Sequence, residues 1–273
     1  MLVRLKRKKI CFQEEFPLDK TWLNYLNLSD EYERKARFIP GVLTVLPLLS
    51  VSAVYGGLLG EWVEVLLIGL GVGAVISVGV SHIASAFGNR LQRQLWPDWP
   101  HDSPTNRWLH PDDTSVSRQQ KERWYETIKR FVGLDIEAAL EKRDENEIKA
   151  IINDAVKAIR DRLWKVPEAE RLRLHNIDYG FARNLTALRP VWMLFAVGSA
   201  LGCWAGYMWY GRPLSWCIIS TFGAVAAFPL GFAVLPGYVR QKAHFYAESF
   251  FGSLVACDKA ERSTKTAQPT LPL

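Results

Sequence analysis

The sequence predicts an all-α membrane protein with four transmembrane helices in two hairpins and a mainly helical cytoplasmic domain between them. Four stretches contain no Asp, Glu, Lys or Arg, and each exceeds the roughly 18 residues typical of a transmembrane helix: 38–60, 65–87, 190–211 and 213–239. Very short links join these stretches into two pairs, which the hydrophilic residues 88–189 separate. The near-zero mean hydropathy of the chain hides them, because charged residues elsewhere offset the apolar ones.

This pattern divides the chain into six parts. We expect a cytoplasmic N-terminal segment, a transmembrane hairpin, a cytoplasmic helical domain, a second transmembrane hairpin, a cytoplasmic amphipathic helix and a disordered tail at residues 1–37, 38–87, 88–189, 190–239, 240–257 and 258–273, respectively. Apart from Arg212, the basic residues that flank the spans all lie on one side. By the positive-inside rule, both termini and the central domain therefore face the cytoplasm.

The N-terminal segment is basic, but it lacks the apolar core and the small-residue cleavage site of a secretory signal. Its run Arg4–Lys9 suits anionic lipid or nucleic acid, and the membrane helices nearby favour lipid. Residues 88–189 carry 19 Lys and Arg against 17 Asp and Glu, a net charge of 19 − 17 = +2. That balance is not typical of a nucleic-acid-binding domain, so no nucleic-acid partner is expected.

A glycine-rich run in the second span, Gly69-x-Gly71-x-x-Ala74, fits the dinucleotide-binding fingerprint. That fingerprint needs a following helix with a solvated side, whereas residues 65–87 carry no charge. We therefore interpret the run as part of a set of small residues, spaced by four, that lets membrane helices approach closely. The predicted helix-packing residues are Ser52, Gly56, Gly60, Gly69, Gly73, Ser77, Gly198, Gly202, Gly206, Gly223, Ala227 and Gly231.

A loop rich in tryptophan and proline, "LWPDWPHDSPTNRWLHPDD", opens the cytoplasmic domain. Proline at this density excludes a regular helix, and the aromatic rings need packing partners, so we expect an ordered loop beneath the membrane. The loop holds groups that can bind a metal or transfer a proton: His101, Asp102, His110, Asp112 and Asp113. Their spacing matches no metal motif and is typical of turns, so no catalytic residue, metal or cofactor is expected.

Three helices are predicted after this loop. Ser115 or Ser117 caps the first, which ends at Gly133. The second has an apolar stripe at three-and-four spacing from Ile148 to Leu163. Pro167 suits the first turn of the third, which continues toward the membrane. Such a domain is too small to bury a large core alone, so it packs on itself, on the membrane or on neighbouring subunits.

Polar groups gather where the third helix meets the third span. Two interpretations stay open for Arg183 and Asn184. Their side chains either anchor the span by reaching the membrane surface, or they join Arg240 and His244 beyond the fourth span in a basic pocket for a phosphate-bearing ligand.

Two segments resemble a family of uncharacterised bacterial inner-membrane proteins. They are "WPDWPHDSPTNRWLHPDD" after the first hairpin and Tyr179-Gly180-Phe181-Ala182-Arg183-Asn184-Leu185 before the second, and the resemblance extends over residues 35–255. It implies a multi-pass protein of the bacterial inner membrane, without an established activity. In topology alone, the chain is also similar to four-span effectors of bacterial phage defence.

The preferred functional hypothesis is an oligomeric inner-membrane effector or channel controlled from its cytoplasmic domain. The expected partners are the lipid bilayer, further copies of the chain, and a cytoplasmic protein or a small phosphate-bearing ligand. The small-residue stripes favour this hypothesis, because they provide surfaces for helix association. A membrane scaffold that recruits a cytoplasmic partner is the second hypothesis. A membrane enzyme that uses the His/Asp-rich loop is the third, since no set of residues demands a reaction.

Overall fold

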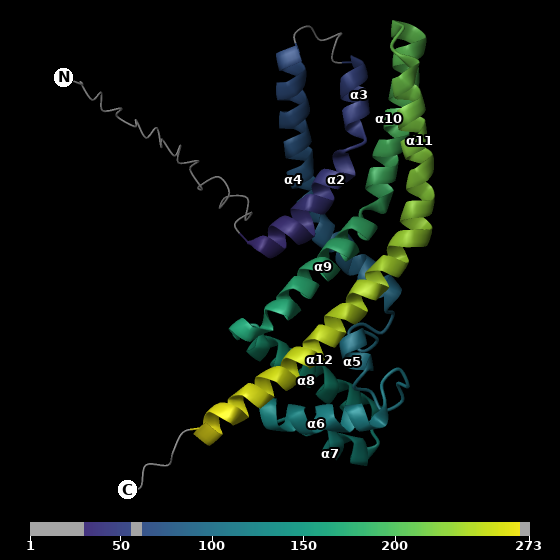
Figure 1. The fold of residues 1–273 in the computed structure, drawn as a ribbon. Helices are drawn as coiled ribbons and strands as arrows, with labels where there is room; N and C mark the ends of the chain where they lie inside the picture. The colour runs from purple at the N-terminus through teal and green to yellow at the C-terminus, as the bar shows by residue number, and fades with distance from the viewer. Residues whose placement is uncertain (1–29, 56–61, 268–273) are drawn as a thin grey trace, which may run out of the picture.

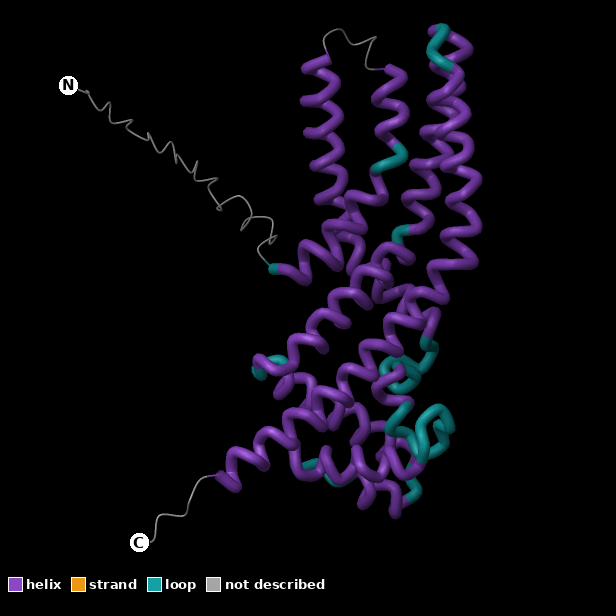
Figure 2. The backbone as a smooth tube through the Cα atoms, viewed as in Figure 1, coloured by secondary structure: helices purple, strands orange, loops and turns teal. Residues whose placement is uncertain are grey.

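The computed structural model describes residues 30–55 and 62–267, and within these ranges the protein is all-α, as predicted (Figures 1 and 2). The molecule is elongated, with the long hairpin helices at one end and a cluster of short helices at the other (Figure 1). The long or apolar helices are α2 (Ile39–Val45), α3 (Leu48–Tyr55), α4 (Trp62–Leu95), α10 (Arg189–Tyr210), α11 (Leu214–Pro229) and α12 (Leu235–Ala267). The segment predicted to be cytoplasmic, residues 88–189, keeps the name cytoplasmic domain, and its helices are α5 (Pro104–Arg107), α6 (Arg118–Val132), α7 (Ile136–Lys142), α8 (Glu145–Leu163) and α9 (Glu170–Ala187).

Within the described residues, two helices are long and apolar enough to cross a membrane: α10 and the continuous helix Leu214–Ser263. A third candidate is the pair Glu33–Val45 and Leu48–Tyr55, whose halves are bent by 42°. The described part of the chain is thus helical with two or three candidate spans, which is compatible with a membrane protein, whereas the arrangement of four spans stays a prediction.

Helix α4 contains the predicted second span, 65–87, and runs without a break into the cytoplasmic domain. The run Gly69–Ala74 is helical, which is incompatible with the tight turn of a dinucleotide fingerprint. For residues 62–77 the structure describes the backbone alone. The predicted packing residues that fall outside the described side chains are Gly56, Gly60, Gly69, Gly73 and Ser77.

Proline and glycine shape the hairpins. Pro47 follows the end of α2 and coincides with the bend between α2 and α3, because proline cannot donate the next helical hydrogen bond. Gly211, with φ 61°, ends α10 in the left-handed conformation, and Pro213 precedes α11. Pro229 lies inside the following helix, where a short π-helical turn, η4 (Leu230–Val234), absorbs it without ending the helix.

Local capping explains the cytoplasmic helices. Ser117 accepts a hydrogen bond from the Gln120 amide at the start of α6, and Gly133, with φ 75°, ends that helix. Asp144 caps α8 in the same way. Pro167 opens a single 3₁₀ turn, η3 (Pro167–Ala169), that leads into α9. The predicted ends of the first helix are therefore confirmed, and α8 contains the predicted apolar stripe of the second. The third helix begins at Glu170, after the 3₁₀ turn rather than at Pro167, and the short helix α7 was not predicted.

The cytoplasmic domain shares its core with the C-terminal helix α12. Residues of α6, α8 and the Trp/Pro loop surround three fully or almost fully buried side chains of α12: Phe250, Phe251 and Leu254. The ring of Phe251 stacks on Trp124 with centroids 4.0 Å apart. The domain is too small to bury a large core by itself, and α12, which is continuous with the second hairpin, supplies the missing apolar surface.

The C-terminal part of the chain differs from the prediction. Residues 240–257 do not form a separate helix, since α12 begins at Leu235 directly after η4. The predicted disordered tail from residue 258 is instead helical to Ala267, and only 268–273 lie outside the described residues. Ion pairs explain the extension: the buried Asp258 meets Arg130, with 3.3 Å between Nη2 and Oδ2, and Glu261 meets Arg162 at 2.7 Å.

The described small residues of the hairpins fall into two groups. A Cβ added to Gly202 would lie 3.3 Å from Val51 of α3, and one added to Gly206 or Gly231 would clash with Val54 or with Met193. Ala227 is buried, while Ser52 bonds the carbonyl of its own helix at Leu48. By contrast, a Cβ on Gly198 or Gly223 would meet no described atom within 4 Å. Only some of the predicted packing residues therefore contact another helix of the same chain.

We expect Gly202→Leu to destabilise the protein by about 1–3 kcal/mol, the typical cost of overpacking. A leucine there must displace Val51 and separate α10 from α3. The control is Gly198→Leu on the same helix, at an exposed position that faces open space within one chain, and both variants are compared in a detergent that keeps the protein monomeric. Thermal unfolding in detergent measures both variants, and equal melting temperatures would contradict the close approach of the two helices.

Candidate functional site

The polar junction beneath the hairpins is built on helix α9, which crosses α4, α12 and the short helix η1 (Glu33–Phe38). Arg183 and Asn184 of α9 are both buried at this crossing. Arg183 donates from Nη1 to Gln92 Oε1 at 3.2 Å and from Nε to Asn184 Oδ1 at 3.3 Å. Asn184 donates from Nδ2 to the Ala36 carbonyl at 2.7 Å. The two side chains thus join three elements.

Two glycines allow this crossing. A Cβ on Gly88 of α4 would lie 2.9 Å from Arg183 Nε and even closer to Asn184 Oδ1. A Cβ on Gly180 of α9 would lie 2.9 Å from Ala36 Cβ and 2.9 Å from the Tyr32 hydroxyl. Glycine at both positions lets the helix backbones come close enough for the buried hydrogen bonds to form.

The other two residues of the predicted phosphate pocket lie elsewhere. Arg240 and His244 are exposed on α12, and the His244 ring is 5.7 Å from that of Trp108. No hydrogen bond or ion pair of the described residues joins either of them to Arg183 or Asn184. The structure therefore brings together Arg183 and Asn184 as a buried link between helices, and it does not gather the four residues.

A salt bridge ties α12 to α9 near the junction. Lys242 Nζ lies 2.7 Å from Asp178 Oδ2, and this hydrogen bond raises the pKa of Lys242. Arg189, at the start of α10, lies over the Phe232 ring at 5.0 Å from its centroid. Both cations thus connect one hairpin helix to a neighbouring element.

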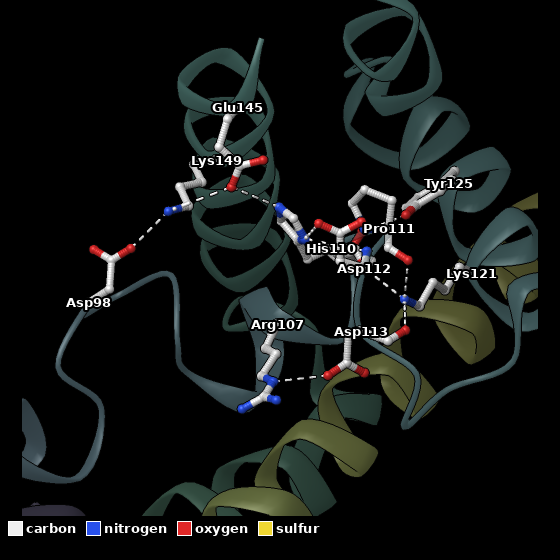
Figure 3. Close-up of polar contacts among 11 residues, drawn as sticks. Asp98, Arg107, His110, Pro111, Asp112, Asp113, Lys121, Tyr125, Glu145 and Lys149 are labelled. Carbon is white, nitrogen blue, oxygen red and sulfur yellow. Dashed lines mark hydrogen bonds and ion pairs between the residues drawn. The ribbon is translucent and has the colours of Figure 1, made fainter. Parts of the chain in front are cut away.

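The Trp/Pro loop, residues 95–113, is ordered as predicted, although Pro104–Arg107 form one helical turn, α5, that the prediction excluded. Helix α6 holds the loop in place (Figure 3). Lys121 of α6 is 4% exposed, and its ammonium donates to the carbonyls of His110, Pro111 and Asp113. Tyr125, one turn further, donates to the Leu109 carbonyl. Burial lowers the pKa of Lys121, although the carboxylates of Asp113 and Asp112 oppose that shift. Side chains of α6 therefore fix the backbone carbonyls of the loop through hydrogen bonds.

The predicted His/Asp groups of the loop have different fates. Asp113 is buried, bonds Ser115 and pairs with Arg107 at 3.0 Å, so it has a structural role. Asp102 accepts from the Asp98 amide at 2.9 Å within a turn. His101 Nδ1 is buried without a hydrogen bond to any described atom. Only His110 and Asp112 converge with a further metal-binding group from another element.

That group is Glu145, the first residue of α8 (Figure 3). His110 Nε2 lies 3.2 Å from Glu145 Oε1, and His110 Nδ1 lies 3.8 Å from Asp112 Oδ2. The sequence did not point to Glu145, because this residue lies 33 positions after Asp112 and no known motif spans that distance. Nor did the sequence point to Gln92, Gly88 and Gly180, whose roles depend on which helices cross.

We expect Lys121→Met to destabilise the cytoplasmic domain by about 1–3 kcal/mol, because buried carbonyls then lose their donor. Lys129→Met, also on α6, removes an exposed ammonium that pairs with Asp135 and should change stability little. Urea unfolding followed by tryptophan fluorescence measures both. If both variants unfold at the same urea concentration, Lys121 does not hold the loop.

A cavity of about 410 Å³ lies within the hairpin region, between α2, α3, α10 and α11. Its lining is apolar apart from hydroxyls, and it includes Leu43, Trp192, Ala196 and Ile219. Ser199 is also part of the lining, and its hydroxyl is buried without a hydrogen-bond partner. No Asp, Glu, Lys or Arg is among its lining residues, so the cavity has no ring of charged side chains of the kind that selects ions in many channels.

Comparisons of the chain with protein-family models, with curated proteins and with solved structures find no match. The resemblance to a bacterial inner-membrane family therefore stays a prediction, and the geometry described above is what supports a function.

Proposed function

We propose that this chain is an effector of the bacterial inner membrane that changes its transmembrane bundle when a partner engages the cytoplasmic domain. In this proposal the chain crosses the bilayer four times, both termini are cytoplasmic, and several copies form the active assembly. The observation that carries the proposal is the continuous helix Leu214–Ser263, which belongs to a hairpin at one end and to the cytoplasmic core at the other.

This helix is suited to transmit movement. Its 50 residues correspond to roughly 75 Å at about 1.5 Å rise per residue. Phe250 and Phe251 bind it to the cytoplasmic core, and Lys242 binds it to α9. A rearrangement of the core therefore shifts or rotates the end of a membrane helix, since helices are stiff and packed interiors do not deform continuously.

An assembly is supported by what one chain lacks. The cavity between α2, α3, α10 and α11 has no charged lining, and in this proposal the route for ions forms between copies. Gly198 is exposed and faces open space within one chain, so it leaves a small surface on α10 for close contact with another helix, whereas Gly223 lines the cavity.

A protein is better supported than a phosphate-bearing ligand as the cytoplasmic partner. Arg183 and Asn184 already donate hydrogen bonds to atoms of neighbouring helices. A surface hollow of about 510 Å³ at the start of α9 has aromatic and carboxylate groups, among them Tyr32, Trp164 and Glu170, and the cation in its lining, Arg173, already donates to backbone carbonyls. Carboxylates repel phosphate, whereas a hollow with exposed aromatic groups suits a polypeptide.

The test compares wild type with Phe251→Ala, which weakens the link between α12 and the core, and with Phe245→Ala, a more exposed position on the same helix. Each is produced in bacterial cells, and a voltage-sensitive dye reports the membrane potential during growth and during phage infection. We expect depolarisation with wild type and Phe245→Ala and none with Phe251→Ala. Native mass spectrometry in nanodiscs should detect oligomers.

The effector proposal fails if the protein is a monomer in detergents and nanodiscs and if no condition changes membrane potential or dye permeability. The scaffold hypothesis then takes its place, because a scaffold needs the partner surface and neither the assembly nor a pore.

The proposed topology makes a separate prediction. Reporter fusions after Leu273 and near Glu145 should both give cytoplasmic signals, because the basic residues that flank the spans lie almost entirely on one side. A fusion in the α10–α11 link at Arg212 provides the opposite control and should be periplasmic. A periplasmic signal at either of the first two sites would overturn the four-span topology.

A further inference from the structure

The cluster of His110, Asp112 and Glu145 is the one group of three or more His, Cys, Asp or Glu side chains in the described part of the chain whose ligand atoms converge (Figure 3). One atom from each residue lies within 4.8 Å of the other two. Two residues come from the Trp/Pro loop, and the third starts α8. We propose that this cluster binds a divalent transition-metal ion of the Zn²⁺ type, which links the loop to α8.

The donor set indicates the class of ion. One imidazole nitrogen with two carboxylates suits Zn²⁺ and related first-row ions, whereas Mg²⁺ and Ca²⁺ prefer oxygen ligands alone. His110 Nε2 and Glu145 Oε1 are 3.2 Å apart. Two donors that each lie about 2.1 Å from one tetrahedral ion are themselves about 3.4 Å apart, so this pair is already close to binding geometry.

The state of His110 is a second observation. Its Nε2 atom is buried, and although Glu145 Oε1 lies 3.2 Å away, no described atom completes a hydrogen bond with it, whereas buried ring nitrogens normally have a partner. The side chain of His110 is 19% exposed, and Lys121 fixes the backbone carbonyl from which it projects. A metal ion beside Glu145 would satisfy this nitrogen.

The other two ligands can adjust to the ion. The side chain of Asp112 is 87% exposed and that of Glu145 is 55% exposed, so both carboxylates can reorient without disturbing the core. Water can complete the coordination shell at this exposed position. The backbone beneath Asp112 is fixed through Lys121 and Tyr125, which reduces the entropy lost on binding.

Lys149 gives the proposal a directional test. Its ammonium lies 3.6 Å from Glu145 Oε1, the same oxygen that faces His110, and 3.0 Å from Asp98. A positive charge at that distance competes with a metal ion for the carboxylate. Lys149→Met should therefore strengthen metal binding, whereas loss of any ligand should weaken it.

The experiment uses the full-length protein in detergent, stripped with a chelator, and titrates it with Zn²⁺ by calorimetry and with Co²⁺ by visible absorption. We expect one equivalent of bound ion. His110→Ala, Asp112→Asn and Glu145→Gln should each weaken binding by about tenfold or more, since even the loss of an outer-shell partner often costs that much. Lys149→Met should tighten binding. The matched controls, His175→Ala and Glu141→Gln, should leave affinity unchanged.

Thermal unfolding without metal shows that the variants are folded, and exposed Asp112 and Glu145 make this a safe comparison. Zn²⁺ should also slow hydrogen exchange in the loop and in the first turn of α8 of the wild type alone. The proposal is overturned if no saturable binding occurs, or if His110→Ala binds Zn²⁺ as tightly as wild type. In that case His110 and Glu145 form only a direct polar contact. The outcome does not depend on the proposed effector function.

Discussion

Phe251→Ala should cost about 3–5 kcal/mol of unfolding free energy, the range for removal of a fully buried aromatic side chain. Phe251 is 2% exposed and lies between Trp124, whose ring it stacks on at 4.0 Å, and Phe250, whose ring is 5.3 Å away. The cavity left behind is bounded by large rings, which cannot collapse into it as flexible side chains would. The loss of unfolding free energy at this position should therefore lie near the upper end of that range.

The matched control is Phe245→Ala. Phe245 lies on the same helix but is 36% exposed, and its nearest described ring contact is His175 at 6.3 Å. The same chemical change there should cost about 1 kcal/mol or less. Chemical denaturation in detergent, followed by tryptophan fluorescence, measures both, because Trp124 lies in direct contact with Phe251. Equal losses would mean that α12 does not belong to the cytoplasmic core.

Local signals made the cytoplasmic helices predictable. Ser117, Gly133 and Pro167 each act on the backbone within a turn of their own position, so their residue types indicate where helices begin and end. The absence of charge over 190–211 and 213–239 likewise predicted the second hairpin, because the membrane requirement applies to each segment separately.

Long-range packing made the rest unpredictable. The apolar residues of 240–257 indicate a helix with a buried face, but nothing in their spacing tells that the partner is the core around Trp124. The burial of Arg183 depends on Gln92, which is 91 positions away on another helix. The His110–Glu145 contact has the same origin, since it requires the fold that places the start of α8 beside the loop.

Gly180→Ala should destabilise the protein although alanine is the better helix former. The added Cβ would lie 2.9 Å from Ala36 Cβ and 2.9 Å from the Tyr32 hydroxyl. Ala36 is 0% exposed and its Cβ is attached directly to the backbone, so only a shift of η1 relieves the clash. Overpacking of this kind costs about 1–3 kcal/mol. The shift also lengthens the hydrogen bond from Asn184 to the Ala36 carbonyl, now 2.7 Å.

The control substitution should have the opposite sign. Gly252 lies inside α12, is exposed, and would place a new Cβ in open space, so Gly252→Ala should stabilise by up to about 1 kcal/mol through helix propensity alone. The double variant Gly180→Ala with Ala36→Gly removes the clashing atom and should recover part of the loss, which a double-mutant cycle measures as a coupling energy. If Gly180→Ala instead stabilises as Gly252→Ala does, α9 and η1 do not cross at contact distance. The Arg183–Asn184 junction would then lack the close approach on which its hydrogen bonds depend.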